Sequence, residues 1–157
     1  MSAELPRSGR IVGGEHHYPV RVYYEDTDAA GRVYHANYLR FAERARTEML
    51  RCAGVEQERL RQETGVVLVV RRSTIDFRAA AVLDDDLVVA SRLAAHAGAA
   101  VDIVQEIRRG GAVLAHLDNR IACLAANGRP TRLPPALLSA VALYLRPNPT
   151  MADAHAR

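Results

Sequence analysis

Asp28 and His35 are the two side chains whose type and spacing best suit chemistry on a carbonyl group. They flank a polar turn at residues 26–31, and the apolar residues that follow recur at helical spacing. A helix that begins near His35 presents unpaired backbone N–H groups and partial positive charge at its first turn. Those groups can stabilise an oxyanion while a neighbouring carboxylate acts as nucleophile or general base. The segment therefore predicts a catalytic site that contains Asp28 and His35.

Three residues near this pair have both a functional and a structural interpretation. Tyr24 lies four residues before Asp28, so its hydroxyl could orient the carboxylate, and we include it among the catalytic candidates. It also alternates with two valines, which is equally consistent with a place in the core. We expect Asp26 to be structural and Asn37 to cap the helix. No metal is expected at Asp26, Asp28 and His35, because no spacing typical of zinc ligands accompanies them.

The elements that must position this pair begin with alternating apolar residues at 17–25, which predict a strand. A long helix is predicted from about residue 35 to about residue 52, because one apolar stripe recurs at three- and four-residue steps. The stripe consists of Tyr38, Phe41, Ala42, Ala45 and Met49. Residues 55–64 predict a second, shorter helix, which Gly65 would close.

The rest of the chain changes from helical to extended periodicity. Strands are predicted at residues 66–78, 86–96, 100–109 and 112–125, and Gly110-Gly111 predicts a hairpin between the last two. A final helix is expected after Pro134-Pro135. One long helix followed by a run of antiparallel strands is an α+β arrangement, in which the sheet curls around the helix.

Length and composition indicate a single domain with a substantial core. The chain has 157 residues, of which 49% are hydrophobic and 25% are charged. We expect residues 17–146 to form this domain. The polar, glycine-containing residues 1–16 predict a disordered arm, and residues 147–157 predict a disordered tail.

Charge and cysteine content exclude several classes of protein. The net charge of +3 is carried by arginines scattered among acidic residues, with no basic stripe that would indicate nucleic-acid binding. Cys52 and Cys123 are too few and too far apart for a disulfide framework or a zinc site. The sequence contains no apolar run typical of a signal peptide or a transmembrane segment, so we expect a cytoplasmic protein.

One long segment resembles a known family. Residues 23–51 read YYEDTDAAGRVYHANYLRFAERARTEMLR, which resembles the signature of the 4-hydroxybenzoyl-CoA thioesterase family of hot-dog-fold proteins. The segment is most similar to the bacterial Tol-Pal-associated acyl-CoA thioesterase branch of that family. The resemblance continues through residues 68–87 and covers roughly residues 18–135. A motif of this length is far more specific than a short pattern.

The resemblance implies a hot-dog fold and an enzyme that hydrolyses acyl-CoA to a free carboxylic acid and CoA, without a cofactor. It places Asp28 at the catalytic carboxylate position, His35 at the helix N-terminus and Tyr24 at an aromatic position implicated in catalysis in that branch. It also implies a homodimer or homotetramer with interfacial active sites, with acyl-carrier protein or lipid-synthesis enzymes as further partners. Arg32 departs from the family, in which an aliphatic residue is usual at this position, so the acyl preference stays open.

Other functions also remain open at the level of sequence. One is a hot-dog hydratase or dehydratase, although that chemistry usually combines an acidic residue and a histidine in a different pattern. Another is a non-catalytic acyl-thioester-binding or scaffold protein of the cell-envelope or lipid-synthesis machinery. The sequence also does not decide whether Asp28 attacks directly or activates water, or whether CoA or a carrier protein bears the thioester. Candidate contacts to CoA phosphates, chosen by charge alone, are Arg71, Arg72, Arg78, Arg108 and Arg109.

Overall fold

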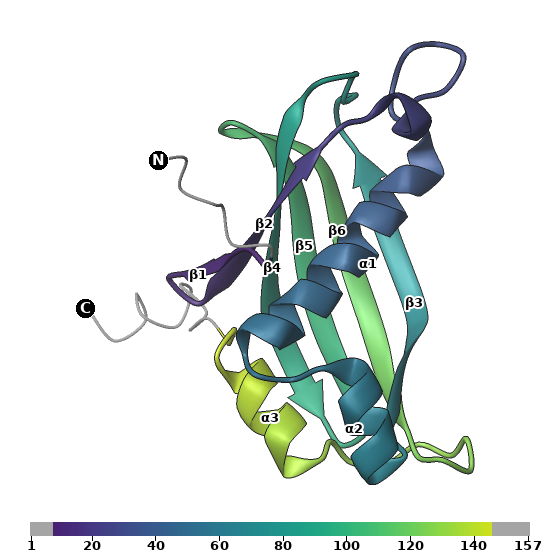
Figure 1. Ribbon diagram of the computed structural model, residues 1–157, viewed down its shortest axis with the longest axis vertical. Coiled ribbons are helices and arrows are strands. Elements are labelled where there is room, and N and C mark those ends of the chain that lie inside the picture. Colours follow the sequence, from purple (N-terminus) through teal and green to yellow (C-terminus); the bar gives the residue numbers. More distant parts are fainter. Residues whose placement is uncertain (1–7, 146–157) are drawn as a thin grey trace, which may run out of the picture.

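The computed structural model describes residues 8–145, in which a six-stranded antiparallel sheet curves around one long helix, α1 (Figure 1). The strands are β1 (Arg10–Val12), β2 (Glu15–Arg21), β3 (Val67–Phe77), β4 (Asp86–Ala97), β5 (Ala100–Arg109) and β6 (Ala112–Leu124). Their order across the sheet is β1-β2-β4-β5-β6-β3, so β1 and β3 are the edges. The helices are α1 (His35–Cys52), α2 (Gln57–Thr64) and α3 (Pro135–Ala142). The predicted α+β arrangement is confirmed.

The core lies between α1 and the inner face of the sheet. All five residues of the predicted apolar stripe are at most 2% exposed. The N-terminal half of α1 packs in one cluster with fully buried side chains of the central strands, among them Val89, Ile107 and Leu117. A second cluster joins the C-terminal half of α1 to α2 and α3 through Leu60 and Leu137. Burial of each large side chain contributes about 1.5–3 kcal/mol, so this packing determines where α1 lies on the sheet.

A buried polar group, Gln105 on β5, connects α1 to three strands. Its side-chain oxygen accepts hydrogen bonds from Arg46 on α1 at 2.9 Å and from Asn119 on β6 at 3.0 Å. Its amide nitrogen donates to the Ser91 hydroxyl and to the Ala42 carbonyl, both at 3.0 Å. These bonds satisfy a polar side chain that is fully buried, and they fix the helix against sliding or rotating on the sheet.

The prediction that residues 1–16 form a disordered arm is wrong for residues 10–16. β1 and the start of β2 form a hairpin over residues 10–16, and both glycines of its turn, Gly13 and Gly14, have positive φ angles of 56° and 74°. That Gly-Gly pair is the same hairpin signal that was recognised at residues 110–111. His16 is fully buried in β2, and its Nε2 lies 2.6 Å from the Ser8 carbonyl. Residues 1–7 and the predicted tail at 147–157 lie outside the described residues.

The first predicted strand, at residues 17–25, is wrong at its C-terminal end. β2 stops at Arg21, and residues Tyr24–Asp26 form a single 3₁₀ turn. The Asp26 carboxylate accepts a hydrogen bond from the Tyr23 backbone N–H at 2.8 Å, which favours the turn over the strand. Tyr24 is therefore 81% exposed and does not belong to the core.

Candidate active site

Asp28 lies in a tight hairpin loop that precedes α1. Its backbone N–H donates to the Arg32 carbonyl at 2.8 Å, and its carbonyl accepts from Gly31, whose φ angle is 76°. The carboxylate oxygen Oδ1 accepts from the Ala30 N–H at 2.9 Å and, more weakly, from the Arg32 N–H at 3.4 Å. The second oxygen, Oδ2, has no hydrogen-bond partner within residues 8–145. The loop thus holds the carboxylate in place and leaves one oxygen available to a substrate.

Asp26 ties this loop to α1. It is 5% exposed, and its Oδ1 accepts from the Asn37 side-chain amide at 2.7 Å. Its backbone carbonyl accepts from the Tyr34 N–H at 2.9 Å. The structural role predicted for Asp26 is consistent with these contacts. The cap predicted for Asn37 is wrong, because Asn37 lies within the first turn of α1 and its side chain reaches back to Asp26.

α1 begins at His35, and the residue before it, Tyr34, supplies no side-chain cap. The backbone N–H groups of His35 and Ala36 have no hydrogen-bond partner in the described part of the chain. The His35 ring is exposed, lies 4.5 Å from the Tyr34 ring centre to centre, and meets the Phe77 ring edge-on at 6.5 Å. This helix end therefore offers two backbone donors and the positive end of the helix dipole to a bound anion or carbonyl.

A pocket of about 290 Å³ brings these groups together. It is lined by Asp28, Arg32, Val33, His35, Tyr38, Phe77, Arg78, Ala79 and Ala80. Tyr38 is held in place because its hydroxyl accepts the Ala81 N–H at 3.0 Å, and its ring packs edge-on against Phe77 at 5.4 Å. The pocket therefore combines an apolar aromatic wall with a carboxylate and a helix N-terminus, as a carbonyl-cleaving site requires.

The structure brings two of the three predicted catalytic residues together. Asp28 and His35 line the same pocket, whereas Tyr24 is not among the lining residues. Sequence reasoning missed Phe77, the last residue of β3, which lines the pocket. The C-terminal end of β3 lies beside the start of α1 (Figure 1). Its position in an alternating strand identified it only as a strand residue. Its contact with His35 depends on how β3 runs along the helix.

The wall behind the pocket is held by Asp85 and Arg109. Asp85 accepts from the Val82 N–H at 2.9 Å and from the Arg109 guanidinium at 2.7 Å, and the same guanidinium donates to the Ala80 carbonyl at 3.1 Å. The hydrogen bond from Val82, together with Arg109, lowers the pKa of Asp85. Arg108 pairs with Glu15 at 3.0 Å. These two candidates for CoA-phosphate binding are thus engaged within the chain, while Arg78 lines the pocket.

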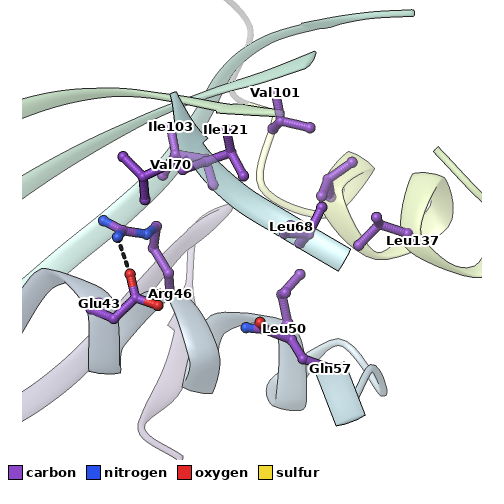
Figure 2. A pocket seen from close by; sticks show the side chains of 11 residues that line it. Glu43, Arg46, Leu50, Gln57, Leu68, Val70, Val101, Ile103, Ile121 and Leu137 are labelled. Atoms are coloured by element: carbon purple, nitrogen blue, oxygen red, sulfur yellow. Dashed lines mark hydrogen bonds and ion pairs between the residues drawn. The ribbon is translucent and has the colours of Figure 1, made fainter. Parts of the chain in front are cut away.

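A second cavity, shown in Figure 2, lies beside the C-terminal half of α1. Apolar side chains such as Leu50, Leu68 and Ile121 surround it, and the Glu43–Arg46 ion pair lies on one wall. Its volume is about 40 Å³. An apolar cavity that admits benzene measures about 150 Å³, so this space holds at most a few small molecules such as water. It is a small cleft that opens at the surface beside exposed Glu43 and Val70, and the larger pocket at Asp28 is the candidate active site.

The family model of the thioesterase-like superfamily matches residues 22–141, a range that contains the whole pocket. The chain belongs to this superfamily. Its relatives include an acyl-CoA thioesterase, YbgC, from Haemophilus influenzae, which is 45% identical over 107 residues, or 68% of this chain and 79% of that protein. The acyl-CoA thioester hydrolase YbgC of Escherichia coli is 49% identical over 90 residues, or 57% of this chain and 66% of that protein.

A solved structure also supports the superfamily assignment. The probable thioesterase from Bartonella henselae is 36% identical, with a TM-score of 0.73 over 76% of this chain and 99% of that one. The resemblance inferred from residues 23–51 is confirmed, although the thioesterase-like superfamily is broader than the 4-hydroxybenzoyl-CoA thioesterases. The predicted hot-dog fold is also confirmed. Within residues 8–145, no helix is both long and apolar enough to cross a membrane.

Proposed function

We propose that this protein is an acyl-CoA thioesterase, which hydrolyses an acyl-CoA to a free carboxylic acid and CoA. The observation that carries the proposal is the placement of the Asp28 carboxylate and the uncapped N-terminus of α1 in one pocket. The names of the relatives with 45% and 49% identity support the same reaction. We expect no cofactor, since the proposed steps use only Asp28, the helix N-terminus and water, and CoA enters as part of the substrate.

In the proposed reaction, the thioester carbonyl oxygen accepts hydrogen bonds from the backbone N–H groups of His35 and Ala36. These donors stabilise the negative charge that develops on the oxygen when the carbonyl carbon is attacked. The aromatic wall, which includes Tyr38 and Phe77, packs against the acyl group beside the carbonyl. In this mechanism the exposed His35 ring orients the substrate or the attacking water.

Asp28 acts through its free oxygen Oδ2 in one of two ways. As a nucleophile, it adds to the carbonyl carbon, expels the CoA thiolate and forms a mixed anhydride, which water then cleaves to the acid and the regenerated carboxylate. As a general base, it removes a proton from a water molecule that attacks the same carbon. In both routes the C–S bond breaks, and the thiolate leaves as CoA after protonation. Tyr24 stays a predicted catalytic residue, whose role would require contact with the substrate outside this pocket.

We also propose that the protein is a homodimer or a dimer of dimers, in which a second copy covers β3 and closes the pocket. β3 is an edge strand of 11 residues, and its apolar side chains Val69, Val70 and Phe77 are 38–47% exposed. A long, exposed apolar edge favours pairing with another strand. Phe77 belongs to both this edge and the pocket, so pairing at β3 would bury one side of the active site.

The proposed reaction is tested by thiol release from purified protein incubated with short-chain, long-chain and hydroxybenzoyl-CoA thioesters. We expect stoichiometric formation of thiol and free carboxylic acid from at least one of them. A hydrated acyl-CoA formed without thiol release would instead indicate a hydratase. Acyl-CoA binding without turnover would indicate a binding protein. Release of the acid only from acyl-carrier-protein thioesters would indicate that the substrate is carried by acyl-carrier protein and not by CoA.

We expect the reaction to occur in the cytoplasm. The two free cysteines, Cys52 and Cys123, fit that reducing compartment.

A further inference from the structure

Arg32 lines the active-site pocket, and its backbone is held there by two neighbouring segments. Its carbonyl accepts the Asp28 N–H at 2.8 Å on one side, and it forms an antiparallel bridge with Val82 on the other. The next residue, Val33, donates its N–H to the Ala81 carbonyl at 2.9 Å. The backbone of Arg32 is therefore held between the catalytic loop and the segment behind the pocket. Arg32 is exposed and lines the same pocket as Asp28 and His35.

The guanidinium of Arg32 lacks an anionic partner within residues 8–145. It forms no ion pair or hydrogen bond with any described side chain, including Asp28. The other arginine of the pocket, Arg78, donates to Asp76 at 3.1 Å and is thereby partly neutralised. Arg32 is exposed, so water solvates its charge in the absence of a ligand. A substrate that fills the pocket would displace some of this water, and an anionic oxygen near the guanidinium would replace it with charge-assisted hydrogen bonds.

We infer that Arg32 is a specificity-determining residue, which binds anionic oxygens of the substrate and favours acyl groups that carry their own carboxylate. This inference rests on the proposed function. Anionic oxygens could come from the acyl group or from the phosphates of CoA. Arg32 and Asp28 are joined by a backbone hydrogen bond and both line the pocket, so the Arg32 side chain begins next to the catalytic carboxylate. The whole pantetheine arm separates the thioester from the CoA phosphates, so the phosphates lie far from Asp28 when the thioester is bound there. The anion that we assign to Arg32 is therefore the carboxylate of the acyl group.

The test compares glutaryl-CoA with pentanoyl-CoA, which have acyl chains of equal length and differ in the terminal carboxylate. We expect wild type to have the higher kcat/KM for glutaryl-CoA. Arg32→Gln should lower the ratio of the two kcat/KM values by about ten- to a hundredfold, mainly through KM, as expected for a lost charge-assisted hydrogen bond. Arg129→Gln removes the same charge from an exposed turn outside the pocket and should leave the ratio unchanged. Arg32→Lys should restore part of the preference.

Three results would overturn the inference. One is a wild-type enzyme with no preference for glutaryl-CoA. Another is an Arg32→Gln protein whose ratio matches that of Arg129→Gln while its melting temperature equals that of wild type. The third is an equal loss in kcat/KM for both CoA thioesters that disappears with the phosphate-free N-acetylcysteamine thioesters of the two acids, because Arg32 would then bind a phosphate. Failure of the proposed function can be distinguished from failure of this inference, because wild type would then release no thiol from any thioester.

Discussion

At the residue scale, Asp26 and Asp28 show how environment separates two identical side chains. Asp26 is buried and uses both carboxylate oxygens to bind the backbone and Asn37. Asp28 is exposed and keeps one oxygen free beside the start of α1. The acidic turn and the helix start were visible in the sequence, so Asp28 and His35 could be predicted as a pair. The position of Phe77 in the same pocket could not, because it depends on a contact between segments about forty residues apart in the chain.

Replacement of Asp26 tests whether it positions the catalytic loop. Asp26→Ala removes the acceptor for Tyr23 N–H and for the buried Asn37 amide. We expect the free energy of unfolding to fall by about 1–3 kcal/mol, because a buried donor loses its partner, and the catalytic rate to fall with it. Urea denaturation followed by circular dichroism measures the first effect.

The matched control for that substitution is Asp86→Ala. The Asp86 carboxylate is 76% exposed and pairs with an exposed arginine, so its loss should cost no more than about 1 kcal/mol. If Asp26→Ala were as stable as this control, the contacts of Asp26 would not hold the loop.

At the element scale, the periodic segments could be predicted and the ends of some could not. α1 begins and ends within a residue or two of its predicted bounds, because its apolar stripe is continuous. The end of β2 was misplaced because the Asp26 side chain, rather than hydrophobic alternation, decides where the strand stops. The hairpin at Gly13–Gly14 was missed because its polar surroundings looked like a disordered arm, although β1 and β2 pair there.

The exposed edge at β3 predicts that a charge on this strand dissociates the oligomer. Val69→Lys places an ammonium group on a side chain that is 38% exposed on that edge, and charged edge residues oppose strand pairing. We expect a monomer by sedimentation velocity and lower thioesterase activity, because the pocket loses its cover. Val12→Lys is the matched control, since Val12 is 44% exposed on the opposite edge strand, β1. Equal oligomeric states for the two variants would contradict a β3 interface.

At the scale of the whole molecule, stability should fall in two steps as pH decreases. Burial is the main cause that lowers the pKa of His16 below 6.5, against the opposing effects of the Ser8 carbonyl and Glu48, and neighbouring His17 lowers it further. As pH falls, the unfolded chain therefore binds this proton before the folded chain does. The contribution of neutral His16 to the free energy of unfolding is complete above pH 6.5 and is lost as pH falls below it.

The second step comes from two carboxylates. Hydrogen bonds lower the pKa values of Asp85, through Val82 and Arg109, and of Asp102, through Arg120. Their contributions are present above the unfolded value of about 4 and decline below it.

The assignment of the first step is tested with His16→Phe, which keeps a ring that can pack edge-on against Tyr144. Melting temperatures measured from pH 8 to roughly pH 5 should decrease in wild type but stay nearly flat in the variant. His96→Gln is the control, because His96 is an exposed histidine on β4 that does not act on His16, and its profile should follow wild type. A His16→Phe profile that decreases as steeply as wild type would assign the step to another group.

The most direct test of the account is thiol release by Asp28→Asn on the acyl-CoA thioester that wild type cleaves fastest. The asparagine side-chain oxygen can still accept the Ala30 N–H, so the loop should keep its shape and the melting temperature should stay close to that of wild type. Asp86→Asn serves as the control for loss of one exposed carboxylate. We expect kcat to fall by about a hundredfold or more in Asp28→Asn and to stay unchanged in the control. A folded Asp28→Asn protein that turns over at the wild-type rate would contradict the assignment of Asp28 as the catalytic carboxylate.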